Sequence, residues 1–155
     1  IIPNRLSALS PILSPNLEAM KQIIKIQYYI TACSNDAMQY AILAAFDNAN
    51  DYPAKMAIEF KARRDLICSR LNDMPGVSCH VPKGAFYVFP KVEVKGMNSE
   101  EVAMALLEGG VLCSPGSAFG QSGEGHLRFA YTISRDDISR GMDKVETVLR
   151  RLQAE

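Results

Sequence analysis

Hydrophobic residues in the first half of the chain recur at the three- and four-residue spacing of helices. This spacing predicts a helix over residues 15–28, a second marked by Met38 to Phe46, and a third that begins at Pro53. Ser14 would cap the first helix, with a proline in its first turn. Alanines in the second helix would allow close packing, and the turn residues 74–76 would end the third.

The spacing then changes to the alternation that is typical of strands. Residues 77–81 predict a strand with Val77, Cys79 and Val81 on one face. Residues 85–89 are continuously apolar and rich in aromatics, which predicts a strand buried on both faces. The simplest arrangement makes these two strands adjacent and antiparallel.

The remaining elements complete an α+β pattern. Asn98 and Glu101 have the spacing of a capping box for a helix that ends at residues 109–110, with Val102, Leu106 and Leu107 facing inward. A short buried strand at 111–114, a glycine-rich loop at 115–125 and a strand at 127–131 follow. A last helix with an apolar stripe, capped by Ser134, would cover the sheet.

Composition sets the class of protein. The 155 residues are 48% hydrophobic, enough for one ordinary domain with a core, and 17 basic residues balance 17 acidic ones. This balance gives no reason to expect binding to nucleic acid. The sequence has no apolar run of the roughly 20 residues that span a membrane and no secretion signal. The four widely spaced cysteines are interpreted as reduced core residues, so we expect a cytoplasmic protein.

Few residues stand out as candidates for chemistry. His80 and His126 lack metal-ligand spacing with each other or with a cysteine or carboxylate. The loop at 115–125 contains four of the ten glycines but lacks the ending of a phosphate-binding loop, which favours a structural role. Arg128 alternates with apolar residues and should point away from Leu127. From the residues alone it is best interpreted as an ordinary strand arginine, and Phe86 and Tyr87 as core residues rather than pocket walls.

Three motifs in order change this interpretation. They are Pro-Lys-Gly-Ala-Phe-Tyr-Val-Phe-Pro at 82–90, Gly-Val-Leu-Cys-Ser-Pro-Gly-Ser-Ala-Phe-Gly at 110–120 and Gly-Glu-Gly-His-Leu-Arg-Phe-Ala-Tyr at 123–131. Together they resemble the C-terminal small domain of fold-type-I aminotransferases, the aspartate aminotransferase-like family. Segments 20–27 and 33–41 resemble helices that follow the family's cofactor-lysine segment.

The resemblance implies a function and a division of the chain. Residues 52–155 would be the small domain, and residues 1–51 a helical segment packing on a large domain that binds pyridoxal 5'-phosphate (PLP). The parent enzyme would be a homodimer that transfers an amino group between an amino acid and a 2-oxo acid. Arg128 occupies the position that grips the substrate α-carboxylate, and Phe86 a position beside the substrate.

The sequence also departs from the family pattern. The family's cofactor lysine follows a serine by three residues, and none of the eight lysines here does; they lie at positions 21, 25, 55, 61, 83, 91, 95 and 144. We therefore expect a fragment that binds no PLP and is inactive alone. A non-catalytic interaction module and the C-terminal part of a PLP-family transcription regulator are the alternatives. The preferred amino acid is not indicated.

Overall fold

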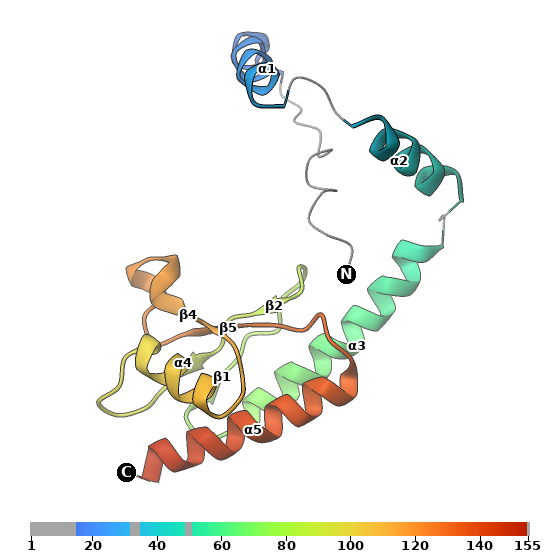
Figure 1. The fold of residues 1–155 in the computed structure, drawn as a ribbon. Coiled ribbons are helices and arrows are strands. Elements are labelled where there is room, and N and C mark those ends of the chain that lie inside the picture. Colours follow the sequence, from blue (N-terminus) through green and yellow to red (C-terminus); the bar gives the residue numbers. More distant parts are fainter. Residues whose placement is uncertain (1–14, 32–34, 49–50, 155) are drawn as a thin grey trace. The chain divides into compact units, whose positions relative to one another are not determined.

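Two helices form the described part of the first unit of the chain. The structure is a computed structural model that describes residues 15–31, 35–48 and 51–154, and it divides into the units Ile1–Pro53 and Ala54–Glu155 (Figure 1). Helix α1 spans Leu17–Thr31 and α2 spans Asp36–Asn48. Asn16 Oδ1 accepts a hydrogen bond from the amide of Ala19 at 3.0 Å and so caps α1; the predicted cap at Ser14 lies outside the described residues.

The first unit leaves its apolar side chains exposed. No described residue of α2 is buried, although the alanine-rich sequence predicted close packing. Large hydrophobic residues on both helices are more than half exposed. These residues are Leu17, Ile24, Ile26, Tyr28, Tyr29, Ile30, Tyr40, Leu43 and Phe46. Within this unit, neither helix therefore buries its apolar residues.

Helices and two small antiparallel sheets form the second unit, which confirms the predicted α+β class. The helices are α3 (Tyr52–Asn72), α4 (Ser99–Glu108) and α5 (Arg135–Ala154). Strand β1 (Val77–Ser78) pairs with β3 (Lys91–Val92). Strand β5 (Leu127–Ala130) lies between β2 (Tyr87–Val88) and β4 (Ser114–Pro115) in a three-stranded sheet.

The hydrophobic core joins one face of β5 to all three helices of this unit. Leu127 and Phe129 are buried on that face of the strand, together with Tyr131 beyond its end. Buried residues of the helices meet them, and these are Ile67, Cys68 and Leu71 of α3, Val102, Ala103 and Leu106 of α4, and Ile138, Met142, Val145, Val148 and Leu149 of α5. Helices α3 and α5 lie side by side (Figure 1), joined by an ion pair of 2.6 Å between Arg70 and Asp143.

Both predicted helix caps in this unit are confirmed. Asn98 Oδ1 accepts hydrogen bonds from the amides of Glu100 and Glu101 at 3.0 Å each, and the amide of Asn98 donates one to Glu101 Oε2 at 2.8 Å. Ser134 Oγ accepts a hydrogen bond from the amide of Asp137 at 3.1 Å at the start of α5. These bonds satisfy amides that the first helical turn leaves without an intrahelical partner.

The predicted strand pairing is wrong. Val77 pairs with Val92 and Tyr87 with Ala130, so β1 and β2 belong to different sheets. Between these strands the chain does not make a tight hairpin turn: Ala85 adopts a φ of 62°, a left-handed conformation rare for residues other than glycine. The carbonyl of Ala85 accepts a hydrogen bond from the Tyr131 hydroxyl at 2.9 Å, which directs the following strand toward β5 instead.

Four predictions about buried positions are also wrong. Residues 85–89 are not buried on both faces, because β2 is an edge strand whose outer side chains remain accessible; Phe86 and Phe89 are 42% and 40% exposed. Leu107 is 45% exposed because the inward stripe of α4 runs through Val102, Ala103 and Leu106. The segment 111–114 pairs only at its end, and Leu112 is 81% exposed. Val81, predicted to share a face with buried Cys79, is 44% exposed.

Candidate functional site

Arg128 lies on the face of the three-stranded sheet that is turned away from the core. Its neighbours Leu127 and Phe129 are buried, whereas Arg128 is half-buried and Ala130 is exposed. Side chains alternate across a strand, so Arg128 and Ala130 share the outer face. The predicted direction of Arg128 is therefore confirmed.

Strand register brings a small set of side chains around Arg128. Ser114 of β4 is directly opposite Arg128, and Tyr87 of β2 is directly opposite Ala130. Residues paired in this way present their side chains on the same face of a sheet. They surround an open pocket of about 260 Å³, lined by Tyr87, Leu112, Cys113, Ser114, Arg128 and Ala130.

The guanidinium of Arg128 has aromatic and hydroxyl neighbours. Its Cζ lies 4.6 Å from the centroid of the Tyr87 ring and 4.5 Å from that of Phe119. Its Nη2 donates a hydrogen bond to Ser114 Oγ at 3.2 Å. No carboxylate of the described residues pairs with it, which removes the structural ion pair as an explanation for this arginine.

The loop at 115–125 carries Phe119 and has a fixed shape. Two 3₁₀ helices, Gly116–Phe119 and Gln121–Gly123, fold the loop so that the backbones of Gly116 and Gly123 touch. A Cβ on Gly116 would lie 2.0 Å from the carbonyl oxygen of Gly123. Only glycine fits this approach, so the loop places Phe119 beside Arg128 through its own backbone packing.

The glycine amides of this loop are already occupied. The N–H groups of Gly116, Gly120 and Gly123 donate to the carbonyls of His126, Ser117 and Gly120 at 2.8, 3.1 and 2.9 Å. The amide of Gly125 donates to the carboxylate of Glu124 at 3.0 Å. A phosphate cradle needs free amides. The interpretation of the loop as structural is therefore confirmed, and the phosphate-binding alternative is wrong.

Glu124 joins this loop to the start of α4. Its two carboxylate oxygens accept hydrogen bonds from the amide of Ser99 at 2.7 Å and from the Ser99 hydroxyl at 3.0 Å. These bonds, above all the one from the Ser99 amide, hold the pKa of Glu124 below its usual value. Because the helix N-terminus favours negative charge, the carboxylate anchors the loop there.

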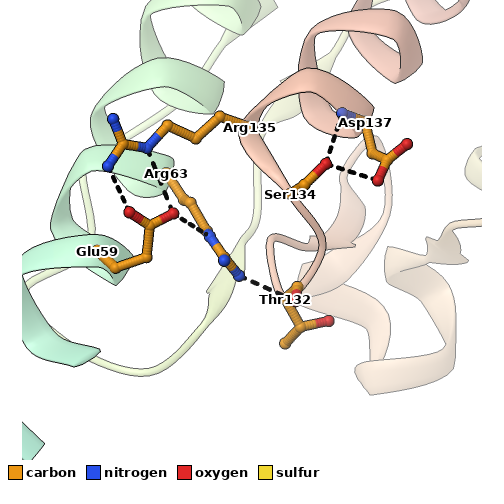
Figure 2. A network of polar contacts seen from close by, with 6 residues as sticks. All are labelled: Glu59, Arg63, Thr132, Ser134, Arg135 and Asp137. Atoms are coloured by element: carbon orange, nitrogen blue, oxygen red, sulfur yellow. Dashed lines mark hydrogen bonds and ion pairs between the residues drawn. The ribbon is translucent and has the colours of Figure 1, made fainter. Parts of the chain in front are cut away.

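A second network holds the end of β5 against α3 (Figure 2). Arg63 donates to the carbonyl of Thr132 at 3.0 Å and to the carboxylate of Glu59 at 2.8 Å, and Arg135 also bonds Glu59. The two guanidinium groups, Arg135 most strongly, lower the pKa of Glu59 to about 2. The chain leaving Arg128 is thus fixed to a helix by charged hydrogen bonds.

Phe86 stands beside this pocket rather than in its lining. Its ring centroid lies 4.5 Å from that of Tyr87 and 6.4 Å from that of Phe60. Its carbonyl accepts the amide of Tyr131 at 3.0 Å. Tyr87, Ser114 and Phe119 contact Arg128. From the sequence Tyr87 was interpreted as a core residue, but it is 37% exposed beside the guanidinium. Ser114 and Phe119 were not singled out, because only the strand register and the loop path bring them to Arg128.

Apart from Cys113, which lines the Arg128 pocket, the other described candidates do not form a site with Arg128. Cys68 and Cys79 are buried free thiols with sulfur atoms 3.9 Å apart, as predicted for core cysteines, whereas Cys113 is only partly buried and Cys33 lies outside the described residues. His126 stacks on Phe89 at a centroid distance of 5.1 Å. In the described ranges, no three histidine, cysteine, aspartate or glutamate side chains converge as metal ligands. No described helix is long and apolar enough to cross a membrane.

Comparison with known proteins finds similar sequences among aminotransferases. Residues 12–145 match the family described as aminotransferase class I and II. The chain is 37% identical over 134 residues to an aspartate aminotransferase of Pyrococcus abyssi, covering 84% of this chain and 34% of the relative. It is 36% identical to aromatic-amino-acid aminotransferase 2 of Thermococcus litoralis, with the same coverage.

A solved structure supports the same relationship. The alanine aminotransferase of Pyrococcus furiosus superimposes with a TM-score of 0.80 at 34% sequence identity. The match covers 89% of this chain and 36% of that enzyme. The chain thus spans about a third of the length of the curated relatives it matches.

Proposed function

The chain belongs to the class I and II aminotransferase family, and we propose that it supplies the substrate-carboxylate arginine, Arg128, of an enzyme that transfers an amino group between an amino acid and a 2-oxo acid. The observation that carries the proposal is the environment of Arg128. Its guanidinium opens onto a pocket, has aromatic neighbours and, within the described residues, lacks a carboxylate partner. An amino acid or a 2-oxo acid provides that carboxylate.

The chemistry of the guanidinium suits this role. It presents a planar fork of N–H donors that can hold both oxygens of a carboxylate. Each charge-assisted hydrogen bond contributes about 1.5–3 kcal/mol, and two of them fix orientation as well as affinity. Leu112 and Ala130 add apolar surface to the lining of the pocket beside Arg128.

The pocket beside Arg128 does not by itself provide a site for PLP, the cofactor that the family implies. The cofactor supplies the electron sink for bond cleavage at the amino-acid α-carbon when it is bound to an enzyme. Covalent attachment needs a lysine, and the pocket beside Arg128 contains none. We assign the cofactor lysine to a large domain, against which the exposed apolar residues of α1 and α2 would pack, so that residues 1–51 belong with that domain and residues 52–155 form the small one.

The same proposal includes the assembly and location of the parent protein. We place it in the cytoplasm, consistent with the free thiols Cys68 and Cys79, and as a homodimer, as the family implies. We propose Phe86 as a wall of the substrate site, through its contact with Tyr87.

Replacing Arg128 tests the proposal. In an enzyme that contains this chain and a cofactor domain, Arg128→Leu should lower kcat/KM for amino acids by about two to four orders of magnitude, the loss of two charge-assisted hydrogen bonds. The absorption spectrum of bound PLP should not change. Arg150→Leu, which removes an exposed arginine paired with Glu146 on α5, is the matched control. Wild-type kcat/KM in Arg128→Leu would refute the role.

A further inference from the structure

The two aromatic neighbours of Arg128 come from opposite sides of β5. Tyr87 belongs to β2, and Phe119 follows β4 on the other side of the central strand. Each ring lies under the guanidinium at about the same distance, 4.6 and 4.5 Å from Cζ, yet the two rings form no aromatic pair with each other in the described part of the chain. Two rings that both lie this close to Cζ without pairing with each other approach the guanidinium from different directions.

A covered guanidinium can donate hydrogen bonds only at its edges. All five of its N–H groups lie in the plane of the group. One of them bonds Ser114 Oγ at 3.2 Å, and Ser114 is fixed directly opposite Arg128 by the β4–β5 pairing. The rings therefore restrict the tilt of the plane, while the hydroxyl restricts rotation within the plane. The remaining donors are left along a defined edge.

The rings themselves are held in place by further contacts. Phe119 packs edge-on against Phe89 at a centroid distance of 5.9 Å, and Phe89 stacks on His126. Tyr87 packs against Phe86 at 4.5 Å. Phe119 is nonetheless 52% exposed and Tyr87 37% exposed, so neither ring is explained by burial in the core.

We propose that Tyr87, Phe119 and Ser114 are positioning residues that fix the plane of the Arg128 guanidinium, so that a substrate carboxylate binds along one edge of it. This inference rests on the proposed function of Arg128. A side chain held in its binding orientation loses less conformational entropy when the ligand arrives, which raises affinity without a new contact. A lysine could not replace the arginine here, because an ammonium group has no plane to orient.

The first test observes Arg128 in this 155-residue chain by ¹⁵N–¹H NMR of the arginine side chains. Its Nε–H signal is identified by its loss in Arg128→Lys. Ring currents from Tyr87 and Phe119 should displace this signal from those of exposed arginines. Phe119→Leu should move it toward them, whereas Phe119→Tyr, which keeps the ring, should not. Tyr40→Leu removes an exposed ring of α2 and should leave the signal in place.

The second test measures kinetics in the full enzyme with the amino acid it uses best among aspartate, alanine and phenylalanine. Phe119→Leu should raise KM about two- to fivefold, the effect of one exposed cation–π contact, with a smaller change in kcat. Ser114→Ala should also raise KM, whereas Ser114→Thr and Phe119→Tyr should behave as wild type. Rescue by these conservative variants separates positioning from general loss of folding.

The outcomes distinguish this inference from the proposed function. If Phe119→Leu has a normal KM and its Arg128 signal stays at the wild-type position, the positioning role is overturned, even though Arg128→Leu still lowers kcat/KM. If the Arg128 signal in Phe119→Leu moves toward those of exposed arginines but KM is unchanged, the positioning role is also overturned. The orientation of the guanidinium plane would then not affect substrate binding. Wild-type activity in Arg128→Leu would instead refute the proposed function, whatever the NMR signal shows.

Discussion

Gly116→Ala should destabilise the second unit of the chain more than the addition of one methyl group at an exposed position would. The added Cβ would lie 2.0 Å from the carbonyl oxygen of Gly123 and 2.7 Å from that of His126. Both oxygens belong to the backbone, so no side-chain rotation relieves the overlap. Separating the segments would also break the hydrogen bond of 2.8 Å from the Gly116 amide to His126.

These two losses set the expected magnitude. Overpacking costs about 1–3 kcal/mol, and a lost backbone hydrogen bond adds about 1 kcal/mol. We therefore expect Gly116→Ala to lower the free energy of unfolding by about 2–4 kcal/mol. For a unit of this size each kcal/mol corresponds to a fall in Tm of about 4–8 °C, which thermal unfolding followed by circular dichroism resolves easily.

Gly141→Ala is the matched control. Gly141 lies within α5, and a Cβ there would meet nothing within 4 Å. Alanine is favoured over glycine inside a helix by about 0.5–1 kcal/mol, so this variant should be more stable than wild type. A free energy of unfolding of Gly116→Ala within about 1 kcal/mol of wild type would contradict the expected overlap. The loop backbone would then move apart more easily than the close contact between Gly116 and Gly123 implies.

Three further predictions concern stability and reactivity. Asn98→Ala removes the acceptor of two α4 amides and should lower the free energy of unfolding by about 1 kcal/mol in urea titrations; no change would refute the cap. The lowered pKa of Glu59, about 2 against a usual 4.5, stabilises the fold above the usual pKa, and this stability is lost as pH falls toward 2. Glu59→Gln should therefore lose less stability than wild type between neutral and acid pH, and parallel curves would contradict this. Burial raises the pKa of Cys79 to about 12, so iodoacetamide should label it, by mass spectrometry, only after unfolding; labelling in the native chain would contradict its burial.

Local signals in the sequence predicted the helices and the caps of α4 and α5. The Asn98 to Glu101 spacing and the apolar stripe of α5 depend only on residues within one or two turns, so they could be interpreted without a fold. Strand pairing depends on distant segments. The alternation at 77–81 and the aromatic run at 85–89 do not indicate β3 or the left-handed conformation of Ala85. The strand nearest in sequence was therefore wrongly predicted to be the partner of β1.

In the candidate site, too, local features were predictable from the sequence and contacts between distant segments were not. The direction of Arg128 followed from alternation within one strand, and its role was inferred from the order of three motifs. Its neighbours depended on pairing across the sheet and on the path of the 115–125 loop. Ser114 precedes an ordinary turn and Phe119 lies in a glycine-rich loop, so neither carries a sequence signal that points to Arg128.

The environment of Arg128 also explains why the simplest interpretation of this residue, an ordinary strand arginine, no longer suffices. A charge that loses water on burial normally gains a partner of opposite charge. Two rings and a hydroxyl contact the Arg128 guanidinium, and no carboxylate within the described residues pairs with it. Cation–π contacts contribute only about 0.5–2 kcal/mol each, less than an ion pair would in the same surroundings. The guanidinium therefore keeps most of its capacity to bind an anion, which supports the proposal that Arg128 binds the carboxylate of a substrate.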